Sequence, residues 1–292
     1  MKALILGSTG MLGHALMNEA RSRGLDAIGL ARTGADRCAD ITDDAALHRI
    51  IGETRPDAVI NTVALVSLDE CEKDPARAYL VNARPASVLA GLCVNNGIYY
   101  VHISTDHYYS GDGNKKHDER HPVELVNEYA RTKFAAECFT LLHPGALVLR
   151  TNIVGFRAVR RAQPTFVEWA FSALEEDAPM TMFRDFYTSS IDVRQFSRIL
   201  FDLTAGKPSG VMNVASRDVR SKQNFIEALA RRMGRKPTQC SAGSITELRG
   251  ARRAASLGLD VAKAEQLLGY ALPSFDQVID SLMNEYNVRK GS

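Results

Sequence analysis

The sequence lacks the features that mark several classes of protein. Its 292 residues contain no run of 18 apolar residues, so no membrane-spanning helix is predicted. The N-terminal apolar stretch ends at Gly7, which is too short for a signal peptide. The cysteines are odd in number, and no two have the Cys-x-x-Cys spacing, which is typical of reduced thiols and not of a disulfide framework or a zinc site. They are Cys38, Cys71, Cys93, Cys138 and Cys240. We therefore expect a cytoplasmic protein that does not associate with a membrane.

Strong net charge and metal-ligand spacing are also absent from the sequence. A net charge of +2 is too small to imply nucleic acid or an anionic membrane as a partner. The histidines other than His107 show neither ligand spacing nor the His-Glu-x-x-His pattern. They are His14, His48, His102, His117, His121 and His143. We expect neither a nucleic-acid partner nor a metal.

The first half of the chain alternates short apolar runs with longer helical patterns. The expected strands are Lys2–Leu6, Asp26–Leu30, Ala58–Asn61, Tyr99–Ile103 and Ala146–Arg150. The expected helices between them include Met11–Arg23, Asp43–Glu53 and Ala76–Asn95. Such alternation predicts an α/β fold with a doubly wound, Rossmann-type parallel sheet that is covered by helices on both faces.

After Arg150 the pattern becomes less regular, which indicates a smaller, mainly C-terminal lobe. Helices are expected at Pro164–Leu174, Ile191–Leu203, Lys222–Met233, Val261–Leu268 and Phe275–Tyr286, and strands at Met180–Phe183 and Val211–Val214. We expect a first domain of residues 1–152 with a returning segment of about 186–215. Residues 153–185 and 216–292 would form the second lobe.

A glycine-rich segment, Gly7-Ser8-Thr9-Gly10-Met11-Leu12-Gly13, directly follows the first expected strand. Gly7 lies where the chain turns from strand to helix, a position that often requires positive φ. Gly10 would let the backbone approach a pyrophosphate, and Gly13 would let the helix pack close to the sheet. The amide groups at the start of the helix, at Met11 and Leu12, favour phosphate. A turn without a ligand is the alternative, but this placement favours a dinucleotide, so the first domain is expected to bind one.

The end of the second strand bears on the choice of cofactor. An acidic residue there binds the ribose of NAD, whereas a cation suits the extra phosphate of NADP. No carboxylate follows Leu30 directly, and Arg32 could contact a 2′-phosphate, although it could also be an ordinary surface arginine. We expect NADPH, with NADH as the alternative. Asp40 and Ile41 would flank the adenine, and Val63, Ala64 and Leu65 would line the ribose side.

Tyr129 and Lys133 lie four residues apart in a helical pattern, so their side chains share one face. A free tyrosine has a pKa of about 10, and a neighbouring ammonium lowers it, which lets the phenol exchange a proton with a substrate oxygen. Thr105 follows the strand Tyr99–Ile103, at the edge where open α/β sheets bind ligands. A second Tyr-x-x-x-Lys copy, Tyr286 to Lys290, lies in a polar tail with no such Ser or Thr before it, so we discount it.

Together, the glycine segment, Ser104-Thr105-Asp106 and Asn127-Glu128-Tyr129-Ala130-Arg131-Thr132-Lys133 resemble the extended short-chain dehydrogenase/reductases. Within them the chain is most similar to the dTDP-4-dehydrorhamnose reductase family. That resemblance implies Thr105, Tyr129 and Lys133 as catalytic residues. It also implies hydride transfer to the C4 ketone of a nucleotide-linked 6-deoxysugar, in deoxysugar or cell-surface polysaccharide biosynthesis. A homodimer is an expectation by analogy of fold.

Departures from the family pattern occur where substrate is bound. Asp106-His107 replaces the family's Asp-Tyr, and Asn152-Ile153 stands in place of a Ser-Trp pair. With Arg252, from a segment that resembles the family's C-terminal substrate motif, these residues are the expected substrate contacts. The sugar and its nucleotide therefore stay open. Two other functions also stay open: a non-catalytic NADP-binding subunit resembling the β subunit of methionine adenosyltransferase, and a nucleotide-sugar epimerase.

Overall fold

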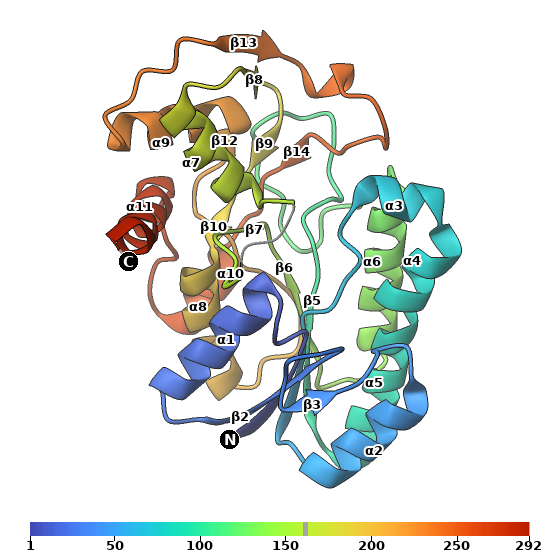
Figure 1. Ribbon diagram of the computed structural model, residues 1–292. Coiled ribbons are helices and arrows are strands. Elements are labelled where there is room, and N and C mark those ends of the chain that lie inside the picture. Colours follow the sequence, from blue (N-terminus) through green and yellow to red (C-terminus); the bar gives the residue numbers. More distant parts are fainter. Residues whose placement is uncertain (160–162, 292) are drawn as a thin grey trace. The chain divides into compact units, whose positions relative to one another are not determined.

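The computed structural model describes residues 1–159 and 163–291. The chain forms two compact units (Figure 1). The first contains Met1–Thr105, Leu125–Arg150 and Ser197–Met212, and the second contains Asp106–Glu124, Thr151–Phe196 and Asn213–Ser292. Within the described residues, no helix is both long enough and apolar enough to cross a bilayer.

The first unit is built on a seven-stranded sheet with the order β11-β6-β5-β4-β1-β2-β3. The strands are β1 (Lys2–Leu6), β2 (Asp26–Ala31), β3 (Arg37–Cys38), β4 (Ala58–Asn61), β5 (Tyr99–Ile103), β6 (Leu147–Arg150) and β11 (Gly210–Asn213). The pairings from β3 to β6 are all parallel, with Leu6 opposite both Leu30 and Asn61. The five strands expected in the first half are confirmed, and so is the α/β fold class.

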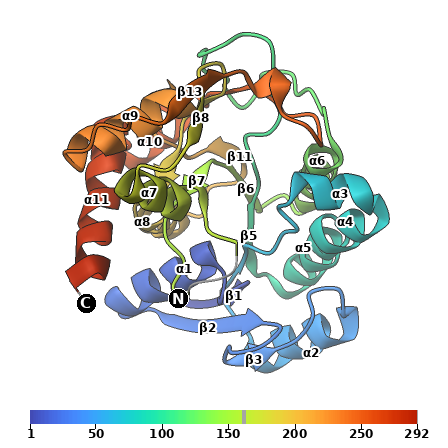
Figure 2. The ribbon, with the colours of Figure 1, turned by 45° about the horizontal axis from the view of Figure 1, so that its top comes forward.

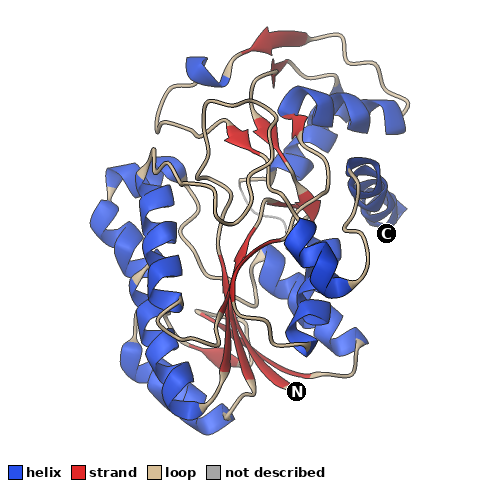
Figure 3. Ribbon diagram, turned by 180° about the vertical axis from the view of Figure 1, so that it is seen from behind, coloured by secondary structure: helices blue, strands red, loops and turns tan. Residues whose placement is uncertain are grey.

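Helices cover both faces of this sheet, which is why its central strands are continuously apolar. The helices of this unit are α1 (Met11–Ser22), α2 (Asp44–Thr54), α3 (Leu68–Lys73), α4 (Pro75–Asn82), α5 (Arg84–Asn96), α6 (Glu128–Thr140) and the part of α8 (Val193–Ala205) from Ser197 onward. Figure 3 shows the red strands with blue helices on either side. In Figures 1 and 2, α1 lies on one side of the sheet and α5 and α6 lie on the other. Leu4, Leu6, Val59 and Leu89 belong to the core of this unit.

The single helix expected over Ala76–Asn95 is wrong, because the structure has two helices there. α4 ends at Asn82, and α5 begins at Arg84 with Pro85 in its first turn. A proline has no N–H to donate, and its ring clashes with the carbonyl group four residues earlier, so a continuous helix through Pro85 is disfavoured. Gly97 ends α5 in the left-handed conformation, with φ of 65°.

The second unit combines helices with short strand pairs. Its helices are α7 (Phe166–Glu176), α9 (Lys222–Arg232), α10 (Ala262–Leu268), α11 (Phe275–Gly291) and the 3-10 turn Ile245–Glu247. Its strands are β7 (Ile153–Val154), β8 (Met180–Phe183), β9 (Tyr187–Thr188), β10 (Ile191–Asp192), β12 (Arg220–Ser221), β13 (Cys240–Gly243) and β14 (Ser256–Leu257). Phe171, Leu229, Val278 and Leu282 lie in its core. Most of these strands have only two residues, too few to produce a sequence period.

The segments of the two units differ from the expected domain bounds. Residues 106–124, expected in the first domain, group with the second unit. His117 forms a parallel bridge with Leu259, and Asn213 donates to the His117 carbonyl, so this segment is hydrogen-bonded to the C-terminal part of the chain. The returning segment spans 197–212, inside the expected 186–215.

Candidate active site

The glycine segment forms a tight turn between β1 and α1, and a side chain at any of its three glycines would lie too close to neighbouring atoms. Gly7 has φ of +81°, and its N–H and that of Ser8 donate to the Leu30 carbonyl at 2.8 and 3.2 Å. A Cβ at Gly13 would lie 2.1 Å from the Gly7 carbonyl oxygen, and one at Gly7 would lie 2.5 Å from Oγ1 of Thr62. A Cβ at Gly10 would be 3.1 Å from the same Gly7 oxygen. Backbone atoms of the turn therefore restrict Gly10 and Gly13 to glycine, and the positive φ together with the Thr62 side chain restricts Gly7.

The N-terminus of α1 is suited to an anion. Gly10 is its N-cap residue, and among the described residues no side chain caps this end and no acidic residue lies in the first turn. The first amides of a helix need partners, and the helix dipole favours negative charge at them. Met11, Leu12 and Gly13 begin the helix, so their amides fit phosphate oxygens. The residues present therefore fit the pyrophosphate of a dinucleotide.

The region after β2 contains an arginine and a carboxylate. Arg32 is exposed, and its charge contributes to lowering the pKa of Asp40, chiefly lowered by hydrogen bonds from the backbone and hydroxyl of Thr42. Asp36, which the sequence analysis missed, accepts a hydrogen bond from the N–H of Gly29 at 2.7 Å. Asp36 lies five residues beyond the end of β2, so a search for an acid directly after the strand could not find it.

The segment Val63–Leu65 is fixed at the end of β4. Val63 donates its N–H to Oδ1 of Asn61 at 3.1 Å, and Leu65 exchanges two hydrogen bonds with the side chain of Asn82, at 2.7 and 3.1 Å. Asn82 also donates to Oγ1 of Thr132 at 2.9 Å, so it connects this segment to α6. Ile41 is buried in the core of the first unit, where it contributes packing.

Helix α6 presents Tyr129 and Lys133 one turn apart, and both are buried. Asn127 caps the helix by accepting a hydrogen bond from Ala130 at 2.8 Å. Nζ of Lys133 donates to the Ile103 carbonyl at 2.7 Å, which places the ammonium at the carboxyl end of β5, where buried Thr105 follows. Burial lowers the pKa of Lys133 to about 8, and the charge of Glu137 opposes this shift. Thr105, Tyr129 and Lys133 thus all lie where β5 ends and α6 begins.

A buried ion pair supports the same region. Arg150 donates to both oxygens of Glu137, at 2.8 Å from Nη2 and 3.1 Å from Nε, and Oγ of Ser104 donates to Glu137 at 2.5 Å. Glu137 and Arg150 are 1% and 4% exposed, so each charge depends on the other. Glu137 was not among the expected site residues. Its position four residues after Lys133, on the same helix face, is the signal that could have identified its role.

In the second unit, two of the expected substrate residues, Asp106 and Asn152, are joined by a hydrogen bond. Nδ2 of Asn152 donates to Asp106 at 2.7 Å, and Oγ of Ser190 donates to Oδ1 of Asn152 at 2.7 Å. Burial, with the charges of Arg253 and Lys222, lowers the pKa of His107 to about 4. His107 is therefore neutral at pH 7. Ile153 begins β7 and pairs with Ile191 of β10.

Two cations that the sequence did not indicate, Arg253 and Lys222, act on this region. Arg252 is exposed and lies 3.7 Å from the carboxylate of Glu124, whereas its neighbour Arg253 acts on His107. Lys222, at the start of α9, has its Nζ 4.3 Å from the ring centre of Phe166. Burial lowers the pKa of Lys222 to about 8, opposed by the charge of Asp106. A lysine in a helical pattern is usually an ordinary surface residue, so the sequence does not indicate that Lys222 acts on Asp106 and His107.

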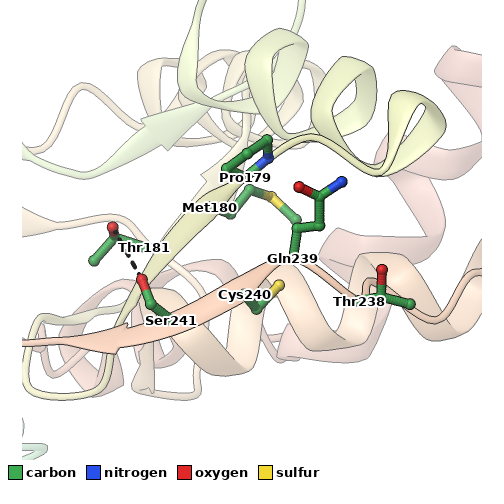
Figure 4. A pocket seen from close by; sticks show the side chains of 7 residues that line it. All are labelled: Pro179, Met180, Thr181, Thr238, Gln239, Cys240 and Ser241. Carbon is green, nitrogen blue, oxygen red and sulfur yellow. Dashed lines mark hydrogen bonds between the residues drawn. The ribbon is translucent and has the colours of Figure 1, made fainter.

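A hollow of about 340 Å³ also lies in the second unit, beside the paired strands β8 and β13 (Figure 4). Its described lining residues are Pro179, Met180, Thr181, Thr238, Gln239, Cys240 and Ser241. Oγ1 of Thr181 and Oγ of Ser241 lie 3.4 Å apart across the strand pair. None of these lining residues is an expected site residue, so the hollow does not enlarge the candidate site.

Known proteins resemble the chain in sequence and in fold. A family model described as the RmlD substrate binding domain matches residues 1–288. A probable low-salt glycan biosynthesis reductase of Haloferax volcanii is 27% identical over 291 residues, 97% of each chain. A dTDP-4-dehydrorhamnose reductase of Mycobacterium tuberculosis is 37% identical over 157 residues, which cover 51% of this chain and 49% of the relative.

Among solved structures, the dTDP-4-dehydrorhamnose reductase of Bacillus anthracis, in complex with NADP, superposes with a TM-score of 0.87. It covers 98% of this chain and 100% of its own at 24% identity, so this likeness concerns the fold alone. The family match extends over nearly the whole sequence and agrees with the motifs at Gly7–Gly13 and Tyr129–Lys133. The chain therefore belongs to the RmlD substrate binding domain family, within the extended short-chain dehydrogenase/reductases.

Proposed function

We propose that this chain is an NADPH-dependent reductase of the C4 ketone of a nucleotide-linked 6-deoxysugar, acting in deoxysugar or cell-surface polysaccharide biosynthesis. The observation that carries the proposal is the bond from Lys133 to the Ile103 carbonyl, 2.7 Å long. Through this bond Lys133 reaches the end of β5, two residues before Thr105 in the chain, and Lys133 lies one helical turn after Tyr129 in α6. Several relatives named as dTDP-4-dehydrorhamnose reductases support the substrate class.

The glycine turn and the region after β2 would hold the cofactor. The amides of Met11, Leu12 and Gly13 would bind the pyrophosphate, and Arg32 would bind the 2′-phosphate. Asp40 and Ile41 would lie on the adenine side, and the segment Val63–Leu65 on the ribose side. The reduced nicotinamide, when bound, supplies the hydride. NADH is the alternative cofactor, because Asp36 offers the type of group that binds ribose hydroxyls.

The three buried side chains at the end of β5 would handle the proton and the carbonyl. Tyr129 would give its phenolic proton to the substrate oxygen as negative charge develops there. Lys133, charged at pH 7 with a pKa of about 8, would stabilise the phenolate that remains. The hydroxyl of Thr105 would donate to the same oxygen and orient it. Most of the rate gain would come from this fixed placement.

The second unit would bind the sugar nucleotide. Asp106, His107, Asn152 and Ile153 are the proposed contacts, with Arg252 at the exposed edge. Neutral His107 can donate one hydrogen bond and accept another, which suits a sugar hydroxyl. The bond between Asn152 and Asp106 would fix both groups before the substrate arrives.

The test measures the loss of NADPH absorbance as the cofactor is oxidised in the presence of each member of a panel of nucleotide-linked 4-keto-6-deoxysugars. We expect turnover with at least one member, and loss of about 100-fold or more in kcat for Tyr129→Phe. Tyr286→Phe, in the second Tyr-x-x-x-Lys copy, is the matched control and should keep wild-type turnover. Undiminished turnover in Tyr129→Phe would remove the proposed acid.

Two other results would favour the other functions. Absence of turnover on every ketosugar, with co-purification of a larger synthetase, would favour a regulatory subunit. Tightly retained NAD that is unchanged after a full reaction would favour an epimerase. The homodimer and the cytoplasmic location stay predictions, to be checked by light scattering and by fractionation of the native host.

A further inference from the structure

The segment Asp106–Glu124 brings together three side chains that the sequence analysis left without a role. Asp112, His117 and His121 each offer one ligand atom, and these atoms all lie within 4.8 Å of one another. All three belong to the second unit. The two histidines are separated by three residues, and the fold of the loop, not a helix, brings the carboxylate to them.

The hydrogen bonds of His117 determine which ring nitrogen carries its proton. Nδ1 of His117 lies 2.7 Å from the Gly258 carbonyl oxygen, which can only accept, so Nδ1 is the protonated nitrogen. In the neutral ring Nε2 therefore carries a lone pair. It lies 3.2 Å from both carboxylate oxygens of Asp112. A lone pair facing a carboxylate is repulsive, so either a second ring proton or a metal cation must lie between Nε2 and Asp112.

The surroundings hold His117 in this orientation. Its backbone N–H donates to the Gly258 carbonyl at 3.0 Å, and its own carbonyl accepts from the N–H of Asp260 at 2.9 Å. The ring of Tyr109 stacks on the imidazole at 4.1 Å between centroids, and His117 is 1% exposed. The ring of His121 lies edge-on at 4.5 Å and is exposed to solvent. His117 is thus a buried histidine with a fixed tautomer, as metal-binding histidines usually are. His121 lies beside it on the solvent-exposed side.

We propose that Asp112, His117 and His121 bind a divalent transition metal, with zinc as the expected ion. Two imidazoles and one carboxylate form a ligand set typical of zinc, and three protein ligands leave a fourth position for water. The donation from Nδ1 of His117 to a backbone carbonyl is the outer hydrogen bond that zinc-binding histidines usually make. The bound metal would fix the segment Asp106–Glu124, which begins with the proposed substrate residues Asp106 and His107.

The experiment titrates Zn²⁺ into the full chain after chelator treatment, with a fluorescent chelator as competitor. We expect one ion per chain with micromolar or tighter affinity, and a rise in the thermal midpoint on binding. His121→Ala should weaken binding at least tenfold and remove the thermal shift, and Asp112→Asn should behave alike. His48→Ala, an exposed histidine on α2, is the matched control and should bind as the wild type does.

Replacing zinc with Co²⁺ gives a second readout that does not depend on activity. A visible absorption band of a tetrahedral nitrogen–oxygen site should appear in the wild type and be absent in His121→Ala. Absence of binding at micromolar Zn²⁺ would overturn the proposal and leave an Asp112–His117 ion pair in its place. Equal binding by His121→Ala and the control would also overturn it, because the ion would then be held by groups outside this cluster.

Discussion

Nζ of Lys133 lies 3.2 Å from Nε2 of His102, and both side chains are buried. An ammonium can only donate, so Nε2 accepts and the ring of His102 is neutral. Burial first, and then the charge of Lys133, hold the pKa of His102 well below its ordinary value. The proposed catalytic lysine is thus fixed by a histidine and by the Ile103 carbonyl, both from β5.

The buried lysine makes stability depend on pH. The folded pKa of Lys133 is about 8, against 10.5 for the ordinary group, so the folded state binds fewer protons than the unfolded state between these values. The free energy of unfolding should therefore gain from this group as pH rises from about 8 to about 10.5, by about 3 kcal/mol in total. Lys133→Met should lack that gain. The measurement is urea denaturation of both proteins at several pH values from 7.5 to 9.5.

Lys73→Met, at an exposed position in α3, serves as the control and should follow the wild-type pH dependence. Comparison with the wild type at each pH removes the contributions of other titrating groups, Lys222 among them. Parallel curves for Lys133→Met and the wild type would contradict the assigned pKa.

The close approach of Gly13 to Gly7 predicts a specific loss of cofactor binding. A Cβ at Gly13 would lie 2.1 Å from the Gly7 carbonyl oxygen, so Gly13→Ala must displace the turn that faces the proposed pyrophosphate. We expect a stability loss of about 1–3 kcal/mol, as for overpacked sites, and NADPH affinity at least tenfold weaker. Calorimetric titration with NADPH and thermal melting are the measurements.

Gly52→Ala is the matched control, because a Cβ built there in helix α2 would meet no described atom within 4 Å apart from its own stretch of helix. Alanine inside a helix is favoured over glycine by about 0.5–1 kcal/mol, so this variant should be slightly more stable and should bind NADPH as before. NADPH binding by Gly13→Ala equal to that of Gly52→Ala would contradict the role of the turn.

The buried pair of Glu137 and Arg150 predicts a large effect from one neutral substitution. Glu137→Gln leaves the Arg150 guanidinium buried without a counter-charge, so the free energy of unfolding should fall by about 3–5 kcal/mol. Urea denaturation at pH 7 measures it. Glu128→Gln, in the partly exposed pair with Arg131 on the same helix, should cost less than about 1 kcal/mol. Similar losses in the two variants would show that burial does not govern this pair.

The exposed arginine after β2 predicts a change in cofactor preference. Arg32→Ala should raise the KM for NADPH about tenfold or more and leave the KM for NADH nearly unchanged, because only NADPH carries the 2′-phosphate. Steady-state kinetics with both cofactors measures the ratio. Arg49→Ala, on the outer surface of α2, is the control. Equal effects on the KM values for NADPH and NADH would contradict a role of Arg32 in cofactor preference. Asp36→Asn would then test whether Asp36 sets that preference.

The sequence predicted the longer strands of the first unit because they are mostly apolar runs, and the burial of Leu4, Leu6 and Val59 explains those runs. It missed β3, whose two residues, Arg37 and Cys38, are exposed. It also predicted the turn at Gly7, where backbone geometry restricts residue type. It missed the break at Pro85, since the helical period continues on both sides of the proline. The strands of two residues in the second unit have no period to find.

The residues of the proposed sites that the sequence did not indicate depend on contacts that only the fold reveals. Asp36 is defined by its bond to Gly29, and Lys222 by Asp106 and the Phe166 ring. Arg253 differs from Arg252 only through its position near His107. Asp112 comes to His117 through a loop that Gly258 and Leu259 hold in place. A local pattern cannot encode a tertiary neighbour, so these residues required the fold.

The interruption between α4 and α5 has a practical consequence for engineering. Asn82 is the last residue of α4, and from there its amide reaches both the Leu65 backbone and Thr132. If Pro85→Ala allowed α4 and α5 to join into one helix, we expect the changed direction after Asn82 to weaken its hydrogen bonds to Leu65 and Thr132. A gain in thermal stability at this joint would then come with a less rigid segment Val63–Leu65, the proposed cofactor contact, so thermostability screens should leave Pro85 in place.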